Sequence, residues 1–291
     1  MNLELAQNIL KKVKDDYDFG SECFARRANP WESIFELIKK QVGAGKKVLD
    51  VGCGDGRYFE ALDGMGVEYT GVDSCEELIE KAKDKFQNSN YSKLFQIKSK
   101  VKNPNNYQLS IINYQVADIL DLPFGDGKFS TKGGPALGWD VVLCIAVLHH
   151  IPSRELQLKA LEEMHRVLKP GGKLIMTNWH LLREAYKPRR IAILLNCYIV
   201  KLLYCFIVSL FHCSIVKNKR CLGFKDLLIP WGITGSKIKR YYYAFSLAEL
   251  RRLVKKSGFN ITDKYYIDRK KKSSFWESFW GRGNIVVVAE K

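Results

Sequence analysis

The sequence predicts an α/β fold built around one doubly wound, mostly parallel sheet of seven strands. From residue 47 onward, short apolar runs typical of strands alternate with segments of helical periodicity, which is the pattern of parallel βαβ units. A glycine-rich turn, Gly52–Gly56, follows the first of these strands directly. The 291 residues are 46% hydrophobic and 27% charged, as in ordinary globular proteins, which excludes a disordered, collagen-like or polytopic membrane chain.

Local patterns predict the elements one by one. Apolar runs predict strands at 48–51, 68–73, 111–117, 141–145, 173–177, 261–267 and 284–289. Helical spacing and capping signals predict helices near the N-terminus and at 30–40, from about 57, 74–86, 154–168 and 246–258. Asn29 and Pro30 suit the N-cap and the first position of the second of these helices. Ser246 and Glu249 have the spacing of a capping box, and Gly258 suits the position after the helix.

The most specific motif is the glycine turn, Asp50-Val-Gly52-Cys-Gly54-Asp-Gly56. Glycines directly after a strand let the backbone approach a ligand and direct N–H groups toward it. The GxGxG spacing lacks the extra residue of the dinucleotide fingerprint, so no pyrophosphate is expected. Asp73 ends the second predicted strand, where its carboxylate can accept hydrogen bonds from two ribose hydroxyls.

Five segments, VLDVGCGDGRYF, GVD, ADILDLPF, WDVVLCIAVLHHI and VLKPGG, resemble in order the S-adenosylmethionine-dependent methyltransferases with the class I, Rossmann-like fold. The segments ARRANPW, CIAVLHH, IPW and RYYYAF are similar to those of the tRNA wobble-uridine carboxymethyl methyltransferases. That resemblance implies an enzyme that methylates the carboxylate of a 5-carboxymethyl-type uridine in the tRNA anticodon loop. It also implies S-adenosyl-L-methionine as the cofactor and a small activator protein as a candidate partner.

The resemblance also implies roles for single residues. The cofactor-binding set would be Asp50, Gly52, Gly54, Gly56, Asp73, Asp118, Ile119 and Cys144. Within it, the glycines would form the cofactor turn, Asp73 would hold the ribose, and Asp118 with Ile119 would face the adenine. Arg27 and Arg240 would bind a substrate carboxylate or a phosphate, for either of which the planar guanidinium is well suited. No metal site is expected.

The chain is predicted to be a single domain, 1–291, in four parts. These are N-terminal helices at 1–45, a cofactor-binding core at 46–180, a helical insert or lid at 181–245, and a closing helix with strands at 246–291. The eight cysteines include no CxxC pair, and the N-terminus lacks the apolar run of a signal peptide. The expected compartment is therefore the cytoplasm.

The segment 191–216 has the length and much of the apolar character of a membrane span. However, Lys201 lies near its middle and both flanks are basic, so a lid packed on the sheet is favoured. Peripheral membrane contact and a spanning helix remain alternatives. Four cysteines recur every eight residues from Cys197 to Cys221, which on a helix separates neighbours by about 12 Å, too far to share a metal ion.

The excess positive charge lies in the second half of the chain. Residues 151–291 hold 28 Lys and Arg against 10 Asp and Glu, a net charge of +18, whereas residues 1–150 hold 19 against 21, a net charge of −2. Such asymmetry favours a polyanionic partner such as RNA, although a solvated face or an anionic membrane surface would also explain it.

Two other functions stay open from sequence. A small-molecule or lipid methyltransferase on the same fold would need a base for an acceptor of high pKa, and His149 is then the candidate catalytic base, with His150 beside it. A carboxylate acceptor is already ionised at neutral pH and needs no base. A non-catalytic RNA- or protein-binding scaffold is disfavoured, because the Asp50 turn and Asp73 are intact.

Overall fold

The computed structural model describes residues 1–25, 30–88, 111–128, 137–185, 222–231, 238–281 and 283–291. These residues form an eight-stranded sheet in the order β3-β2-β1-β4-β5-β10-β8-β9. The strands are β1 (Lys47–Val51), β2 (Glu68–Asp73), β3 (Ile111–Val116), β4 (Trp139–Ile145), β5 (Leu168–Trp179), β8 (Asn260–Ile267), β9 (Lys272–Ser273) and β10 (Asn284–Glu290). Strands β1 to β5 pair in parallel, and β10 is antiparallel to both β5 and β8. The predicted doubly wound, mostly parallel sheet is confirmed, with the two-residue β9 as an eighth strand.

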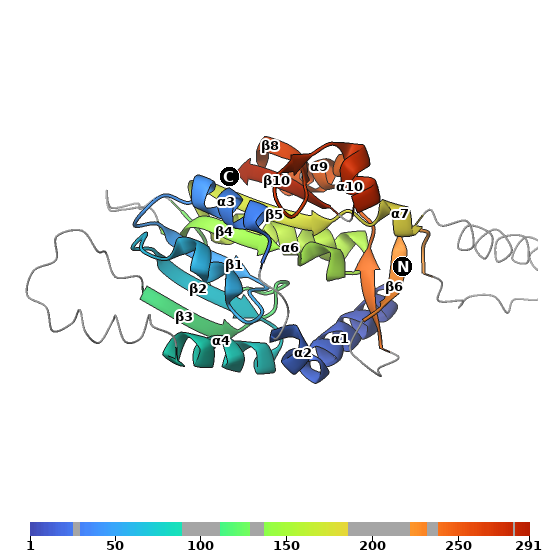
Figure 1. Ribbon diagram of the computed structural model, residues 1–291, viewed down its shortest axis with the longest axis horizontal. Helices are drawn as coiled ribbons and strands as arrows, with labels where there is room; N and C mark the ends of the chain where they lie inside the picture. The colour runs from blue at the N-terminus through green and yellow to red at the C-terminus, as the bar shows by residue number, and fades with distance from the viewer. Residues whose placement is uncertain (26–29, 89–110, 129–136, 186–221, 232–237, 282) are drawn as a thin grey trace, which may run out of the picture.

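Helices cover both faces of this sheet (Figure 1). They are α3 (Glu32–Gln41), the 3-10 helix η1 (Arg57–Leu62) and α4 (Glu76–Asn88) on one face, with α6 (Arg154–Val167) and α9 (Leu247–Lys256) on the other. Consecutive strand residues serve opposite faces: Val48 packs with α3 and η1, whereas Leu49 packs with α6 and α9. This alternation follows from the strand period of two, and it is why β1 is apolar on both sides.

Two further helices, α1 (Leu3–Phe19) and α2 (Ser21–Ala25), lie beyond the tips of β2 and β3, beside α4 (Figure 1). Asn2 caps α1, since its side chain accepts a hydrogen bond from the Leu5 amide at 3.0 Å. The side chains of Ala6 and Val13 are buried beneath α1. Helix α1 therefore covers the carboxyl edge of the parallel strands, where ligands of such sheets bind.

The helix boundaries predicted from capping signals are confirmed in part. The capping box of α9 is confirmed: Ser246 Oγ accepts from the Glu249 amide, and the Glu249 carboxylate accepts from the Ser246 amide at 2.9 Å. The prediction that the helix at 30–40 begins at Pro30 was wrong, because α3 begins at Glu32 with Trp31 in the extended conformation. The helix predicted from about Arg57 does begin there, as the six-residue 3-10 helix η1.

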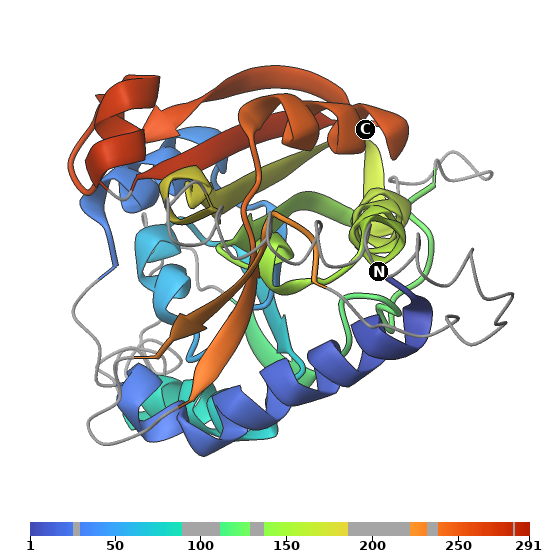
Figure 2. The same ribbon diagram turned by 90° about the vertical axis from the view of Figure 1, so that its right-hand side faces the viewer.

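The described part of the predicted helical insert is mostly not helical. Helix α7 (Leu182–Ala185) is followed, after residues outside the described part, by an antiparallel pair of strands, β6 (Asp226–Pro230) and β7 (Lys239–Tyr243). Figure 2 shows these two strands crossing in front of the sheet, with β7 returning toward α9. The physical reason is the Tyr-rich composition of 240–243, which suits a half-buried strand better than a helix.

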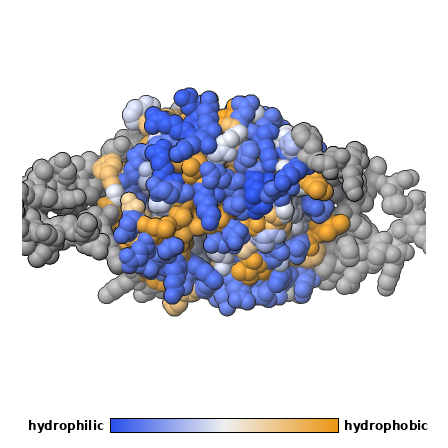
Figure 3. Space-filling model, turned by 180° about the vertical axis from the view of Figure 1, so that it is seen from behind, coloured by the Kyte–Doolittle hydropathy of each residue, from blue (hydrophilic) through white to orange (hydrophobic). Residues whose placement is uncertain are grey.

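The apolar segment 191–216 and the four regularly spaced cysteines lie outside the described residues. Among the residues that the structure describes, no helix is both long and apolar enough to cross a bilayer. Figure 3 shows the face opposite to that of Figure 1, on which hydrophilic side chains predominate and hydrophobic ones form scattered small patches. Scattered exposed apolar side chains of this kind are ordinary on globular proteins.

Candidate functional site

A cavity of about 390 Å³ lies at the carboxyl ends of β1, β2 and β4 and beside the loop that follows β3. Helices α1 and α2 close its outer side, with Val13, Tyr17 and Phe24 in the wall. This position is the usual ligand site of an open α/β sheet, and the volume lies in the range of small-molecule and cofactor sites. The cavity is thus the candidate active site.

The glycine turn after β1 forms the floor of the cavity. Gly52 and Gly54 line it with positive φ angles of 75° and 56°, a region that residues with a Cβ rarely adopt. A Cβ on Gly52 would overlap the Val147 side chain, and one on Gly54 would come within 3.0 Å of the Phe24 ring. Gly56 also has a positive φ but packs against Tyr114 and does not line the cavity. The turn therefore leaves a cradle that side chains would fill.

Asp73, the last residue of β2, is held in place by the neighbouring backbone. Its Oδ2 accepts from the Gly54 amide and its Oδ1 from the Cys75 amide, each at 2.9 Å. Burial raises the pKa of Asp73 above its usual value, while the two amide bonds oppose the rise. Each carboxylate oxygen keeps a second lone pair, so Asp73 can still accept from hydroxyl groups of a ligand in the cavity.

Asp50 lies beneath the turn and not in the cavity wall. Its side chain is fully buried, and Tyr69 donates to its Oδ2 at 2.7 Å. In the described part of the chain, its Oδ1 has no hydrogen-bond partner. Burial raises the pKa of Asp50 to about 7. Asp50 therefore supports the glycine turn from behind and does not contact the cavity directly.

Asp118 and Ile119 lie in the cavity wall, directly after β3. Asp118 Oδ1 accepts from the Leu120 amide at 2.9 Å, which fixes the start of this loop. Cys144 is fully buried within β4 and does not line the cavity, whereas the two residues after it, Ile145 and Ala146, do. Ala146 has φ of 61°, a strained conformation for a residue with a Cβ, of the kind that concentrates at functional sites.

The two adjacent histidines differ in position. His149 is fully buried, does not line the cavity, and stacks with Tyr242 at 5.6 Å between ring centroids. Burial lowers the pKa of His149 to about 3. The structure therefore does not bring His149, the candidate base, to the cavity.

His150 lies in the cavity wall instead. Its Nδ1 is 3.1 Å from the Tyr241 carbonyl oxygen, which can only accept, so Nδ1 carries a proton. In the neutral ring this leaves Nε2 to accept from the Tyr17 hydroxyl at 3.0 Å. The Tyr17–His150 pair thus joins helix α1 to the turn after β4.

Arg240, on β7, is 2% exposed and lies in a box of aromatic rings. Its guanidinium carbon is 3.9 Å from the centroid of Trp231, 4.6 Å from that of Tyr17 and 5.5 Å from that of Tyr242. Its Nε and Nη1 are buried, and neither has a hydrogen-bond partner among the residues that the structure describes. Arg240 does not line the cavity itself, but Tyr17, whose ring it faces, does. Arg27 lies outside the described residues.

Several residues of the site were not predicted from sequence. Tyr17 and Phe24 are the main ones, because no motif marks them and only the three-dimensional arrangement brings α1 and α2 to the cavity. A signal for α1 exists in retrospect: Leu10, Val13 and Tyr17 recur at helical spacing and all three line the cavity. Arg57 was not predicted either; its Nη2 donates to the Phe24 carbonyl at 2.9 Å and so fixes α2 against the glycine turn.

The sequence was compared with protein families and with known proteins. Residues 49–176 match the family described as "Methyltransferase domain". The mouse tRNA (carboxymethyluridine(34)-5-O)-methyltransferase is 26% identical over 188 residues, which cover 65% of this chain and 22% of that protein. The human "Probable tRNA methyltransferase 9B" is 26% identical over 62% of this chain and 31% of its own length. This chain thus spans about a third or less of these two tRNA methyltransferases.

A relative with a different acceptor is also found. The Coxiella burnetii ubiquinone biosynthesis O-methyltransferase is 34% identical over 152 residues, 52% of this chain and 51% of that protein. Among solved structures, a SAM-dependent methyltransferase from Methanosarcina mazei has a TM-score of 0.54 at 18% identity, over 89% of this chain and 98% of that one. The Haloferax volcanii methyltransferase in complex with the Trm112 activator has a TM-score of 0.52 at 17% identity, over 96% of each chain. These two structures share the fold.

Proposed function

We propose that this chain, whose residues 49–176 match a methyltransferase domain, is an S-adenosylmethionine-dependent methyltransferase and that it methylates the carboxylate of a 5-carboxymethyl-type wobble uridine in tRNA. The single observation that carries this choice of acceptor is Arg240. A buried guanidinium without an anionic partner among the described residues is energetically costly, and a substrate carboxylate near it would supply the missing charge. The tRNA methyltransferases among the relatives support the same acceptor.

The residues at the cavity fit the cofactor. Gly52 and Gly54 leave room for a ligand against the backbone, Asp73 presents oriented oxygens for ribose hydroxyls, and Asp118 with Ile119 forms the far wall for adenine. When bound, S-adenosylmethionine supplies an electrophilic methyl group, which passes to a carboxylate oxygen as S-adenosylhomocysteine is released. We assign Asp50, Gly56 and Cys144 to the support of this cavity from behind, because they do not line it.

In this proposal, the chain's own task is alignment. A carboxylate is ionised at neutral pH, so no residue has to remove a proton before methylation. Arg240, with Arg27 from the segment before α3, would hold the carboxylate in line with the cavity. The aromatic rings around Arg240 exclude water, which strengthens its attraction for an anion.

We further propose that the basic second half of the chain binds the phosphates of the anticodon stem. Arg269 to Lys272 are four consecutive exposed basic residues, and Asp268 orders their turn by accepting from the Lys270 and Lys271 amides at 2.8 and 2.9 Å. The turn lies against the start of α3, since the Ser33 amide donates to the Arg269 carbonyl at 3.3 Å. A small activator protein is part of the proposal, supported by the Haloferax complex.

The test is methyl transfer to two pools of total tRNA, one carrying and one lacking carboxymethyl uridine, followed by nucleoside mass spectrometry. The expected result is a methyl ester of carboxymethyl uridine from the first pool and no product from the second. The reaction is run with and without a coexpressed activator, so that a missing partner is not mistaken for a wrong substrate. Equal transfer to both pools would contradict the wobble-uridine acceptor.

A second function is favoured by one observation, the Tyr17–His150 pair. A phenol or alcohol acceptor must lose its proton, and His150 Nε2, reached through the Tyr17 hydroxyl, is a base at the cavity wall. The ubiquinone O-methyltransferase among the relatives supports such an acceptor. A variant separates the two functions: His150→Gln should lower turnover with a phenol acceptor, which must lose a proton, and should not remove a step from the reaction of a carboxylate, which is already ionised.

A further inference from the structure

The loop that follows β3 forms the far end of the cavity. Asp118 and Ile119 lie in the cavity wall, and the chain then runs through Leu122 and Phe124 to the opposite side of α6. Strand β3 is the neighbour of β2, which in turn is the neighbour of β1. A nucleoside that extends from the glycine turn across Asp73 therefore reaches this loop with its base.

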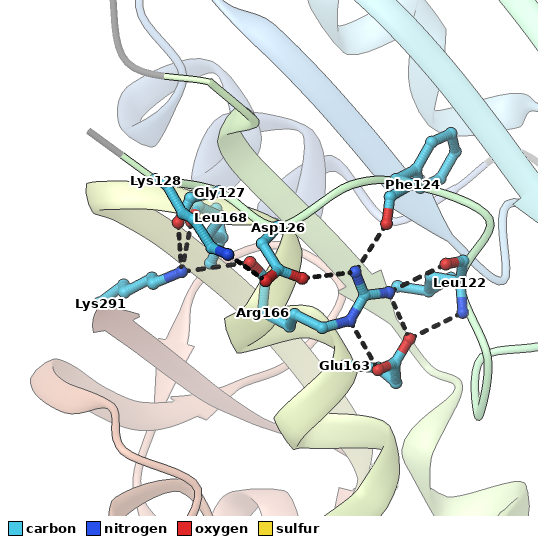
Figure 4. A network of polar contacts seen from close by, with 9 residues as sticks. All are labelled: Leu122, Phe124, Asp126, Gly127, Lys128, Glu163, Arg166, Leu168 and Lys291. Atoms are coloured by element: carbon cyan, nitrogen blue, oxygen red, sulfur yellow. Dashed lines mark hydrogen bonds and ion pairs between the residues drawn. The ribbon is translucent and has the colours of Figure 1, made fainter. Parts of the chain in front are cut away.

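Two residues of α6 hold the loop by its main chain (Figure 4). The Leu122 amide donates to Glu163 Oε2 at 2.8 Å, and Arg166 Nη2 donates to the Leu122 carbonyl at 2.9 Å. Arg166 Nη1 donates to the Phe124 carbonyl at 2.6 Å. Both polar groups of the Leu122 backbone are thus bound by one side-chain pair.

The pair is itself rigid. Arg166 Nε donates to Glu163 Oε1 at 2.8 Å and Nη2 to Oε2 at 2.7 Å, a two-point arrangement that fixes both planes. These bonds raise the pKa of Arg166 and lower that of Glu163, so both remain charged at neutral pH. Lys291 closes the same network, since its Nζ donates to the carbonyls of Gly127 and Leu168 at 3.0 and 2.7 Å.

We infer that the Glu163–Arg166 pair is a positioning device for the cofactor's base: it fixes Leu122, and through it sets where Asp118 and Ile119 meet the adenine. Neither side chain lies in the cavity wall, so the pair acts only through the loop. The inference rests on the proposed placement of the adenine and is independent of the methyl acceptor. A carboxylate such as Asp118 accepts a hydrogen bond from the adenine amino group, and the strength of that bond depends on alignment.

The experiment compares the binding of two probes by calorimetry: S-adenosylhomocysteine, and S-inosylhomocysteine, in which the amino group is replaced by an oxygen. The wild-type protein is expected to prefer the adenosyl probe by roughly tenfold, the effect of one charged hydrogen bond. Glu163→Gln and Arg166→Lys are expected to reduce that preference to about twofold, because the loop is no longer fixed. A loss of folded protein would change both affinities together and leave their ratio unaltered.

Two further variants complete the design. Glu162→Gln makes the same change of charge one residue earlier on α6, at an exposed position, and is expected to keep the wild-type ratio. Asp118→Ala is expected to reduce the ratio as the pair variants do. Hydrogen exchange at the Leu122 amide should be faster in Glu163→Gln than in wild type, which confirms that the bond exists in solution.

The results that would contradict the positioning role differ from those that would contradict the placement of the adenine. A wild-type ratio in both Glu163→Gln and Arg166→Lys, or unaltered exchange at Leu122, would overturn the positioning role. An unaltered ratio in Asp118→Ala would show that the adenine lies elsewhere, and would remove the inference together with the placement on which it rests. None of these results bears on the tRNA acceptor, which the nucleoside analysis tests separately.

Discussion

The Gly54 amide donates a hydrogen bond to Asp73 Oδ2 at 2.9 Å, and this bond joins the turn after β1 to the end of β2. The two residues are 19 positions apart in the chain, yet the parallel pairing of their strands brings them together. The glycine turn and the carboxylate therefore form one unit, in which the amide orients the carboxylate and the carboxylate orders the turn. Changes at either residue are expected to affect cofactor binding.

Gly54→Arg should abolish S-adenosylmethionine binding. A Cβ at this position lies 3.0 Å from the Phe24 ring, which also lines the cavity, and the φ of 56° adds backbone strain. Gly64→Arg is the matched control, because Gly64 also has a positive φ but faces open space away from the cavity. Calorimetry should find no binding in the first variant and wild-type affinity in the second; equal affinity in both would refute the assignment of the turn.

Asp73→Ala should weaken cofactor binding by about 1–3 kcal/mol, since ribose hydroxyls would lose a charged acceptor. Asp73→Asn should fall between wild type and Asp73→Ala, because one carbonyl oxygen remains to accept hydrogen bonds. Asp63→Ala removes an exposed carboxylate from the same domain and should have no effect. The measurement is the Kd of S-adenosylhomocysteine, and a wild-type Kd in Asp73→Ala would exclude a ribose contact.

Arg240→Met should lower turnover on tRNA while keeping or raising the melting temperature. The guanidinium is buried without an anionic partner in the described part of the chain, so its removal costs little stability, and an apolar chain suits the aromatic box. Arg240→Lys should restore turnover only in part, because an ammonium lacks the planar two-point geometry. Thermal melting, tRNA binding and turnover are measured together. A fall in melting temperature with unaltered turnover would assign Arg240 to structure.

Asp50 should make stability depend on pH. Its folded-state pKa of about 7 exceeds the ordinary 3.8, so between pH 4 and 7 the folded protein keeps a proton that the unfolded chain has released. The free energy of unfolding therefore falls as pH rises through this window, by at most about 1.4 kcal/mol per unit, and is level above it. The melting temperature of Asp50→Asn minus that of the wild type should therefore increase as the pH is raised from 5 to about 7.5. A difference that is constant with pH would exclude this titration.

Neutralising Lys270 and Lys271 should weaken binding to any tRNA and lower the salt dependence of binding by about one unit of slope per lysine. Both side chains are exposed in the ordered turn before β9. The matched control replaces Lys255 and Lys256 by glutamine, which makes the same change of charge on the exposed side of α9. Binding curves at several salt concentrations should separate the two pairs, and equal slopes would contradict a phosphate contact at the turn.

The sequence predicted those parts of the fold whose signal is local. Val48, Leu49 and Val51 place apolar side chains on both faces of the segment, and Gly52 and Gly54 follow it, which is sufficient to predict a buried strand followed by a ligand turn. The β6–β7 pair could not be predicted in the same way, because Pro230 and the surrounding charges obscure the strand period. Its register, with Ile229 opposite Arg240, is a property of the tertiary structure.

The residues of the site also fall into those that local sequence predicts and those that only the tertiary structure brings together. Gly52, Gly54, Asp73 and Asp118 lie at or just beyond the carboxyl ends of strands, so a common edge could be predicted for them, and the structure does place them around one cavity. The choice between His149 and His150 could not be foreseen, because adjacent side chains diverge and only the packing of Tyr17 and Tyr242 decides which faces the cavity. The box around Arg240 joins α1 to β7, segments more than 200 residues apart, and no local pattern encodes it.

The place of β10 in the sheet bears on how the chain acquires its structure during synthesis. Residues 284–290 pair with β5 on one side and with β8 on the other, so both of those strands keep an unpaired edge until the ribosome has released residue 290. Unpaired edges of apolar strands invite association between nascent chains. The sheet must therefore close after translation of these residues, through pairings of high sequence separation that form slowly. Protection by a chaperone during that interval would increase the yield of folded protein.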